Sequence, residues 1–236
     1  MNKISIIIPT FNESENIVLL IKKILTLKAV SVREIIVVDD NSPDKTGEIV
    51  KKVFNHNARV LCYVRKGDPD LGKSILLGIQ HARGDIIVGM DGDFNHDVQV
   101  IPTLVQSLTH SDLVVASRFV PGGGMQKKMR YWISYSFNLV LKILFRFPII
   151  DNTSGYYAIP AIKLHSLDLK SIYHGYGEYC LRLLFYAKQM GFRIKTVPVY
   201  YAARSNGVSK SRFFHMAYTY LQTAITLNLT LKTKVQ

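Results

Sequence analysis

The first half of the chain alternates short apolar runs with longer amphipathic segments, and this alternation constrains the possible folds most. The apolar runs, which predict strands, are residues 4–8, 34–38, 60–64, 85–90 and 112–116. The segments between them that predict helices are residues 15–27, 46–54, 71–82 and 98–108. Strands and helices in this order form βαβ units, whose strands lie parallel. The sequence therefore predicts an α/β domain with a mostly parallel central sheet.

The length and composition agree with one domain of this kind. The chain has 236 residues, of which 48% are hydrophobic and 20% charged, so it can bury a large core. Two cysteines, Cys62 and Cys180, are too few to staple a chain of this length, and we expect a reducing, cytoplasmic compartment. These properties exclude collagen-like, disulfide-rich and wholly disordered proteins.

The excess positive charge lies in the second half of the chain. Residues 1–117 contain 13 Lys and Arg against 14 Asp and Glu, whereas residues 118–236 contain 17 against 3. This split favours a protein that holds a metal ion with phosphates and works near an anionic membrane. A basic solvated surface without a function would give the same totals, so charge alone leaves both interpretations open. A nucleic-acid partner is not expected, because the basic residues follow no recognised binding motif.

Acidic turns follow three of the predicted strands. They are residues 9–13, residues 39–44, and residues 91–93 with His96 shortly after. One such turn more often caps a helix than binds a ligand. Three of them at the carboxyl ends of parallel strands lie at one edge of the sheet, where ligands of α/β proteins bind. Carboxylates gathered at one edge repel each other unless a cation or hydrogen-bond donors lie among them.

Asp91 and Asp93 form the sharpest candidate site. Side chains two residues apart at the end of a strand project to the same side, and Gly92 leaves space between them. Hard oxygen ligands suit Mg²⁺ or Mn²⁺, which also bind diphosphate oxygens. His96 is either a further ligand or the cap of the next helix, and we favour a role in the site.

The motifs together resemble the family-2 inverting glycosyltransferases of GT-A (Rossmann-like) fold, and within them the polyprenol-phosphate (dolichyl-phosphate) mannose synthases. The matching segments, in chain order, are residues 6–13, 37–46, 91–93 with His96, 117–124, 151–156 and 204–210. They extend over nearly the whole chain, and the last two are the most specific to the subfamily. Three positions depart from the usual pattern: Asp70 where the family often has Gly, Gly92 where it often has Ala, and Asp97 where it often has Pro. None of them removes a charged site residue, but the first leaves the loop at residues 66–73 open.

The resemblance implies a role for each matching position. Pro9, Phe11, Glu13 and Asp39 would hold the base and ribose of a nucleotide-sugar, and Asp91 and Asp93 the metal. The phosphates of donor and acceptor would be held by Arg118, Arg130, Arg204 and Lys210, and catalysis would depend on Asp91, Asp93, Arg118 and Arg204.

The chemistry of the acceptor decides whether a general base is needed. A sugar hydroxyl would need a carboxylate or His to take its proton. A phosphate monoester has a second pKa of about 6 and is already an anion at neutral pH, so it needs cations instead. The basic second half of the chain favours the phosphate. Glu178 remains open as a base, a sugar-orienting group or a helix-end partner, and Asp151 as a structural or sugar-side residue.

Residues 131–150 and 213–231 are apolar and aromatic but interrupted by polar side chains such as Lys142, Arg146, Gln222 and Asn228. They predict amphipathic helices at a membrane interface rather than spans, although a packed core is the commoner use of such faces. We therefore expect a GT-A domain over residues 1–212 and an interfacial helix over residues 213–236. The protein would be peripheral at the cytoplasmic face of a membrane, and a membrane-embedded partner subunit remains open.

The sequence therefore predicts metal-dependent inverting transfer of a hexose, most simply mannose from GDP-mannose, to polyprenyl or dolichyl phosphate. The alternatives within enzymes are UDP-glucose as donor or a saccharide hydroxyl as acceptor. A non-enzymatic alternative is a module that binds anions or membranes through the basic half alone, whose activity would not depend on Asp91 or Asp93.

Overall fold

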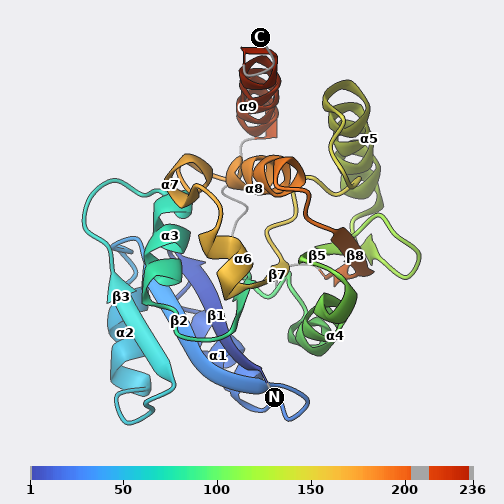
Figure 1. The fold of residues 1–236 in the computed structure, drawn as a ribbon. Helices are drawn as coiled ribbons and strands as arrows, with labels where there is room; N and C mark the ends of the chain where they lie inside the picture. Colours follow the sequence, from blue (N-terminus) through green and yellow to red (C-terminus); the bar gives the residue numbers. More distant parts are fainter. Residues whose placement is uncertain (1, 203–212, 234–236) are drawn as a thin grey trace.

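Strand β1 (Lys3–Thr10) forms the centre of the fold because both of its faces are apolar. Ile6 and Ile8 belong to the core on one side of the sheet and Ile7 to the core on the other, and all three are fully buried. This is the two-residue alternation of a strand covered on both faces. The computed structural model describes residues 2–202 and 213–233 and shows helices on both sides of the sheet that contains β1 (Figure 1).

Within the described residues, the main sheet has seven strands in the order β3-β2-β1-β4-β7-β5-β8. Besides β1 these are β2 (Ser31–Asp39), β3 (Val60–Val64), β4 (Ile86–Gly89), β5 (Leu113–Ser117), β7 (Tyr157–Pro160) and β8 (Ile194–Pro198). All neighbours are parallel except β7, which runs antiparallel to both β4 and β5. The predicted α/β class with a mostly parallel sheet is confirmed. The sequence did not predict the antiparallel strand.

Helices cover the two faces of this sheet. They are α1 (Ile17–Leu25), α2 (Thr46–Val53), α3 (Leu71–His81), α4 (Ile101–Ser107), α6 (Ala161–His165), α7 (Leu169–Ile172) and α8 (Tyr179–Gln189), with short 3-10 turns at Val98–Val100 and Leu108–His110. Residues of α1, α2 and α4 share one core with β1, and residues of α3 and α8 share the other. The helices predicted in the first half are confirmed to within a few residues at each end.

A second, two-stranded sheet joins distant segments beside the main one. β6 (Gly124–Met125) pairs in parallel with β9 (Tyr200–Tyr201), which places Met125 opposite Tyr201. Strand β9 follows β8 closely, and β6 directly precedes helix α5 (Lys128–Phe145). The pairing of β6 with β9 therefore links the edge of the main sheet to the start of α5.

Helices α5 (Lys128–Phe145) and α9 (Phe213–Thr233) project from the body of the protein, at the top of Figure 1. They contact each other, and α9 also packs on α8. Only Asn138 and Leu141 of α5 are buried. In the described part of the chain, neither these helices nor any other has the length and hydropathy needed to cross a membrane. The division of the chain at residue 212 and the interfacial role of residues 213–236 stay predictions.

Candidate active site

A cavity of about 1000 Å³ lies at the carboxyl ends of β1 and β4, between the start of α3 and helices α5 and α9. Seven of the residues assigned to the site from the sequence line it: Pro9, Phe11, Glu13, Asp91, Asp93, Arg118 and Arg130. Four others, Asp39, His96, Asp151 and Glu178, do not line it. Arg204 and Lys210 lie outside the described residues. The structure therefore brings most of the predicted residues to one cavity, and their roles stay predictions.

Asp91 and Asp93 belong to the turn that follows β4. The Asp91 side chain is 43% exposed, whereas Asp93 is only 5% exposed. One Asp93 oxygen accepts a hydrogen bond from the Asn95 backbone N–H (3.1 Å) and the other from the Asn95 amide (2.7 Å). These bonds hold Asp93 in one orientation, so the turn presents two carboxylates to the cavity.

His96 organises this turn from behind. Its Nδ1 accepts a hydrogen bond from the Asp91 backbone N–H (2.9 Å), so in the neutral ring the proton is on Nε2. Nε2 lies 2.8 Å from the Tyr201 hydroxyl and 3.5 Å from an Asp91 oxygen. The ring also stacks on Tyr156, with 4.6 Å between the ring centres. Both nitrogens are thus engaged within the protein, and the imidazole supports the turn.

The donor set of this turn suits a divalent ion that is shared with a substrate. No group of three or more acidic, His or Cys side chains arranged for a metal occurs among residues 2–202 and 213–233. Mg²⁺ typically takes one or two carboxylates and completes its shell with water and substrate phosphates. Asp91 and Asp93 fit this mode, whereas His96, engaged through both nitrogens, does not add a ligand.

Of the two neighbouring acids at the end of β2, only Asp40 lines the cavity. Asp39 is 2% exposed and accepts hydrogen bonds from the Thr10 hydroxyl and the Ser42 backbone N–H, both at 3.0 Å. It ties the turn after β1 to the turn after β2. The sequence motif indicates Asp39 for the nucleotide, whereas its neighbour Asp40 is the one that lines the cavity. The available signal was that adjacent side chains at a strand end point in opposite directions.

Asp40 fixes the loop that leads into α3. It accepts hydrogen bonds from Arg65 Nε (2.5 Å), the Ser74 hydroxyl (2.6 Å) and the Asp70 backbone N–H (2.9 Å). Asp70 in turn caps α3 by accepting from the Lys73 N–H at 2.9 Å. The departure from the usual Gly at this position therefore provides a helix cap at the cavity wall.

The first residues of α3 pack against the turn before α8. The Gly72 N–H donates to the Gly175 carbonyl (2.9 Å). A Cβ on residue 72 would lie 2.4 Å from the backbone nitrogen of His174, so only glycine fits here. In the same turn, Glu178 accepts from the Tyr176 N–H at 2.9 Å and is almost fully buried. The structure thus places Glu178 at the start of α8 as a partner of backbone groups.

Arg118, after β5, forms a buried ion pair with Asp151. The Asp151 carboxylate accepts from the Arg118 backbone N–H (2.8 Å), from Nε (2.9 Å) and from Nη2. Burial disfavours the charged guanidinium, but the Asp151 carboxylate more than offsets this, so the pKa of Arg118 lies above its ordinary value. The guanidinium carbon also lies over the rings of Phe119 (4.9 Å) and Tyr201 (5.1 Å). Asp151 therefore holds Arg118 charged and in place.

The far end of the cavity is apolar. Met129, Ile133 and Phe137 of α5 face this space together with Met216 and Tyr220 of α9. Phe137 and Tyr220 meet edge to face, with ring centres 6.3 Å apart. Arg118 and Arg130 also line the cavity, so one continuous space contains carboxylates, guanidinium groups and an apolar wall.

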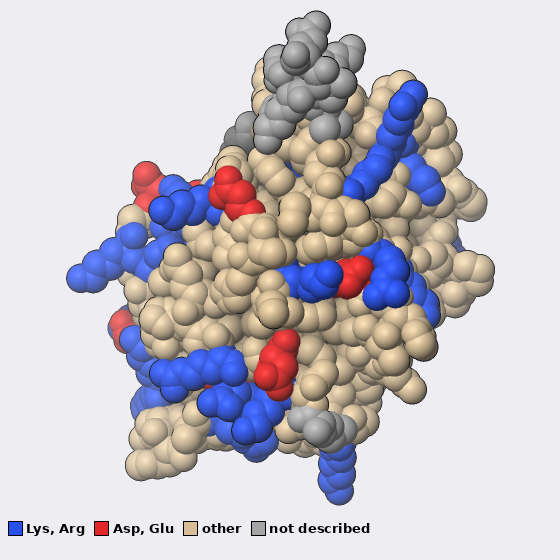
Figure 2. Space-filling view, viewed as in Figure 1, with Lys and Arg blue, Asp and Glu red and all other residues tan. Residues whose placement is uncertain are grey.

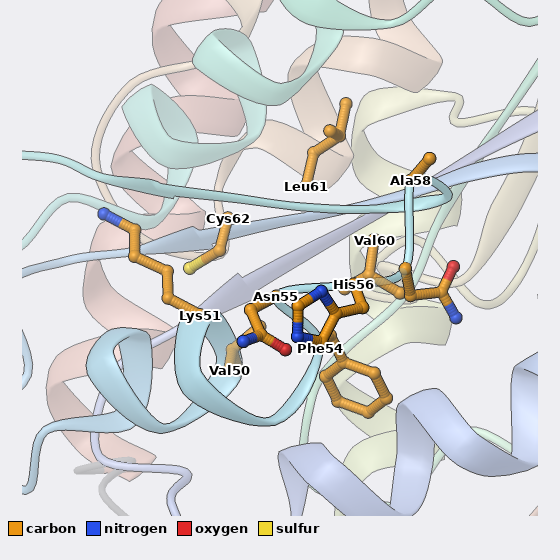
Figure 3. Close-up of a pocket in the computed structure, with 10 residues that line it drawn as sticks. Val50, Lys51, Phe54, Asn55, His56, Ala58, Val60, Leu61 and Cys62 are labelled. Carbon is orange, nitrogen blue, oxygen red and sulfur yellow. The ribbon is translucent and has the colours of Figure 1, made fainter.

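A smaller hollow of about 380 Å³ lies between the end of α2 and strand β3 at the edge of the sheet (Figure 3). Phe54, His56 and Cys62 are among its lining residues. Burial raises the pKa of the Cys62 thiol to about 11, so the thiol stays protonated and unreactive. None of the residues predicted for the site lies in its wall.

The profile described as "Glycosyl transferase family 2" matches residues 5–163. This chain belongs to that family. The cavity is accordingly the candidate active site of a family-2 glycosyltransferase.

Relatives of this enzyme include three proteins whose names describe mannose transfer to a polyprenyl phosphate. It is 34% identical over 210 residues to the undecaprenyl-phosphate mannosyltransferase of Micrococcus luteus, an alignment that covers 86% of this chain and 85% of that protein. It is 32% identical to the polyprenol monophosphomannose synthase of Mycolicibacterium smegmatis, covering 87% and 79%. It is 30% identical to the dolichol-phosphate mannosyltransferase of Pyrococcus furiosus, where 88% of this chain aligns with only 59% of that protein.

Solved structures share the fold. A glucosyl-3-phosphoglycerate synthase of Mycobacterium tuberculosis, crystallised with Mn²⁺, UDP and phosphoglyceric acid, matches with a TM-score of 0.71 and 22% identity, covering 96% of this chain and 78% of that one. A crystal of the same synthase with Mg²⁺ and UDP also has a TM-score of 0.71. At this identity the likeness establishes the fold alone.

Proposed function

We propose that this glycosyltransferase transfers mannose from GDP-mannose to polyprenyl or dolichyl phosphate, with inversion, giving the polyprenyl-phosphate sugar and GDP. The observation that carries the proposal is the single cavity in which Asp91 and Asp93, Arg118 and Arg130, and the apolar faces of α5 and α9 meet. A nucleotide-sugar needs the first set, an acceptor phosphate the second and an isoprenoid chain the third. The three relatives with polyprenyl-phosphate mannose activity in their names support the same substrates.

At the donor end, Pro9, Phe11 and Glu13 serve the base and ribose, with Asp40 and Asp70 in the wall nearby. Asp39 serves the nucleotide from behind the wall, by joining the turns after β1 and β2. Asp91 and Asp93 would hold Mg²⁺ or Mn²⁺ at this end of the cavity. When bound, such an ion neutralises the negative charge that develops on the leaving GDP. The bond between sugar C1 and the GDP oxygen breaks, and a bond between C1 and an acceptor phosphate oxygen forms.

The acceptor phosphate needs donors and cations rather than a base. Its second pKa of about 6 leaves it anionic at neutral pH. Asp151 is neutralised by Arg118, and Glu178 accepts a backbone hydrogen bond, so neither is placed as a free base. Arg118, Arg130, Arg204 and Lys210 serve the phosphates of the two substrates, and Arg118, Arg204, Asp91 and Asp93 are the groups on which transfer depends.

The lipid acceptor implies a membrane surface, and α5 and α9 are the elements suited to meet it. Large apolar side chains of α5 remain exposed, among them Trp132 (61%), Ile143 (66%) and Leu144 (64%). On α9, Tyr218 and Leu229 are exposed by 59% and 58%. Figure 2 shows basic side chains over α5, and further basic side chains elsewhere on the same side of the molecule with several acids among them. We place the enzyme peripherally at the cytoplasmic face of a membrane. A membrane-embedded partner subunit would bind the same surface of α5 and α9.

The test is product analysis by mass spectrometry with purified enzyme, Mg²⁺ and a mixture of GDP-mannose and UDP-glucose. Polyprenyl phosphate, polyprenol and a free saccharide are offered as acceptors. The expected product is polyprenyl-phosphate hexose of the mannose series, with GDP released. Equal transfer to polyprenol or to the saccharide would overturn the acceptor, and a product from UDP-glucose would overturn the donor.

A further inference from the structure

Thr153 lines the cavity beside Arg118 and is half-buried. It lies between Asp151 and strand β7, opposite Asn138 of α5. Its hydroxyl oxygen accepts a hydrogen bond from Arg118 Nη2 (3.0 Å) and another from Asn138 Nδ2 (3.2 Å). A hydroxyl has two lone pairs and one proton, so both lone pairs of Thr153 are used by its neighbours.

Neither neighbour can accept the Thr153 proton. A guanidinium group has only donors. The orientation of the Asn138 amide is fixed because its Nδ2 also donates to the Ser134 carbonyl at 2.8 Å, which keeps the N–H side facing Thr153. Within residues 2–202 and 213–233, the two bonds that Thr153 Oγ1 accepts are its only hydrogen bonds. The proton is therefore directed away from both donors, at a residue of the cavity wall.

Arg118 also has hydrogen-bond donors that no residue of the described part uses. Its charge is matched by the buried Asp151 carboxylate, and its Nη1 donates to no residue of the described part. The Arg118–Asp151 pair is neutral as a unit, so it offers a ligand oriented hydrogen-bond donors rather than net charge. The cationic neutralisation of a phosphate then falls to other residues, such as Arg130.

We propose that the Thr153 hydroxyl donates a hydrogen bond to a phosphate oxygen of the polyprenyl phosphate acceptor, with Arg118 and Asn138 acting as the residues that orient it. This assignment rests on the proposed function. The ligand chemistry is an anionic phosphate oxygen, which the donor diphosphate also offers. The acceptor is chosen because Thr153 is bonded to α5, the helix that supplies the apolar wall, whereas the candidate metal ligands follow β4.

The experiment compares Thr153→Val, which keeps the shape and removes the hydroxyl, with Thr153→Ser, which keeps the hydroxyl. KM for polyprenyl phosphate and kcat are measured at saturating GDP-mannose, and GDP affinity is measured by titration with Mg²⁺. A hydrogen bond to a charged group contributes about 1.5–3 kcal/mol, so Thr153→Val should raise KM for the acceptor about tenfold to a hundredfold. Thr153→Ser should stay close to wild type, and both variants should bind GDP normally.

Three other results would contradict either the role of Thr153 or the proposed function. An unchanged acceptor KM in folded Thr153→Val, or a loss confined to thermal stability and kcat, shows that the hydroxyl only supports the structure. Weaker GDP binding in Thr153→Val assigns the hydroxyl to the donor instead. Wild-type enzyme that transfers to no polyprenyl phosphate refutes the proposed function itself, independently of the variants.

Thr153→Val leaves two buried donors without an acceptor, which can prevent folding. In that case Asn138→Leu provides the comparison, because it keeps the hydroxyl but removes one of the donors that orient it. The acceptor KM should then rise severalfold with GDP affinity unchanged, and an acceptor KM equal to that of wild type would contradict the proposal.

Discussion

The Tyr201 hydroxyl lies 2.8 Å from His96 Nε2, and this contact joins strand β9 to the turn that carries Asp91 and Asp93. The same Tyr201 ring lies 5.1 Å from the guanidinium carbon of Arg118. One side chain thus touches the support of the candidate metal ligands and a residue assigned to the phosphates. The relative position of these groups therefore depends on Tyr201.

Tyr201→Phe should weaken the metal turn without disturbing the ring contact with Arg118. His96 is 1% exposed, and its Nε2 proton would lose its acceptor, which costs about 1–3 kcal/mol. We expect a lower midpoint of urea unfolding and a higher Mg²⁺ concentration for half-maximal GDP binding. Tyr200→Phe is the matched control, because Tyr200 is the other residue of β9 and is 50% exposed. Equal Mg²⁺ requirements in the two variants would contradict this role.

The contact between His96 and Tyr201 also shows what the sequence could not predict. The two residues are 105 positions apart, and β9 has only two residues, too few for a strand pattern. By contrast, β1 to β5 were predictable because each is a short apolar run, and the turns after β1, β2 and β4 follow from the parallel arrangement of these strands.

Within those turns, residue type alone did not separate ligands from supports. Asp39 and Asp40 are chemically identical, yet Asp39 joins two turns and only Asp40 lines the cavity. Thr153 gave no signal of its own, because its importance comes from the donors that surround it. Such assignments depend on hydrogen bonds between distant segments, which a sequence pattern does not contain.

Asp91→Asn should remove the effect of the metal on donor binding. The amide keeps the size of the side chain but loses the anionic oxygen that a hard cation prefers. We expect Mg²⁺ to increase GDP affinity in the wild type and not in the variant, and sugar transfer to fall by about a hundredfold or more. Asp97→Asn is the control, since Asp97 caps the following turn and does not line the cavity. Full transfer activity of Asp91→Asn in the presence of EDTA would exclude the metal site.

Arg118→Lys should reduce transfer although the charge is kept. Lysine cannot form the fork that bonds Asp151 and Thr153 together, so at least one charged hydrogen bond is lost. We expect transfer to polyprenyl phosphate to fall about tenfold to a hundredfold. Arg146→Lys, at the end of α5 and outside the cavity wall, should be neutral in steady-state kinetics. The assignment fails if the two lysine variants are equally active.

Asp44 should make stability depend on pH in the acidic range. Burial disfavours its carboxylate, but hydrogen bonds from Thr46 and Ser14 outweigh this and hold the pKa of Asp44 below the ordinary value of 3.8. A carboxyl with a depressed pKa in the folded state stabilises the protein above its unfolded pKa, and this contribution is lost as the pH falls through the folded-state pKa. Asp44→Ala removes the acceptor of the Ser14 and Thr46 N–H groups and should lower the free energy of unfolding in urea at neutral pH by about 1 kcal/mol.

Below the ordinary pKa of 3.8 the difference between wild type and Asp44→Ala should shrink, because the wild-type carboxyl is then protonated too. Glu15→Ala, which removes a carboxylate at an exposed position nearby, is the control and should leave the free energy of unfolding at neutral pH close to that of wild type. A difference for Asp44→Ala that stays constant from neutral to acidic pH would mean that the ionised carboxylate is not the stabilising form.

Leu144→Asp and Leu229→Asp should detach the enzyme from membranes without unfolding it. Both leucines are largely exposed, on α5 and α9 respectively, so the core does not depend on them. A charge at either position opposes insertion of the apolar face into the interface, and nearby Lys and Arg contribute about 1 kcal/mol each at an anionic surface. Flotation with vesicles that contain anionic lipid should fall in both variants, while GDP binding stays unchanged because the donor end of the cavity is untouched.

Ile162→Asp is the control, since Ile162 is 81% exposed but lies on α6. If the Ile162→Asp protein leaves the vesicles as readily as Leu144→Asp, or if wild-type enzyme does not float with anionic vesicles at low salt, α5 and α9 are not the membrane surface.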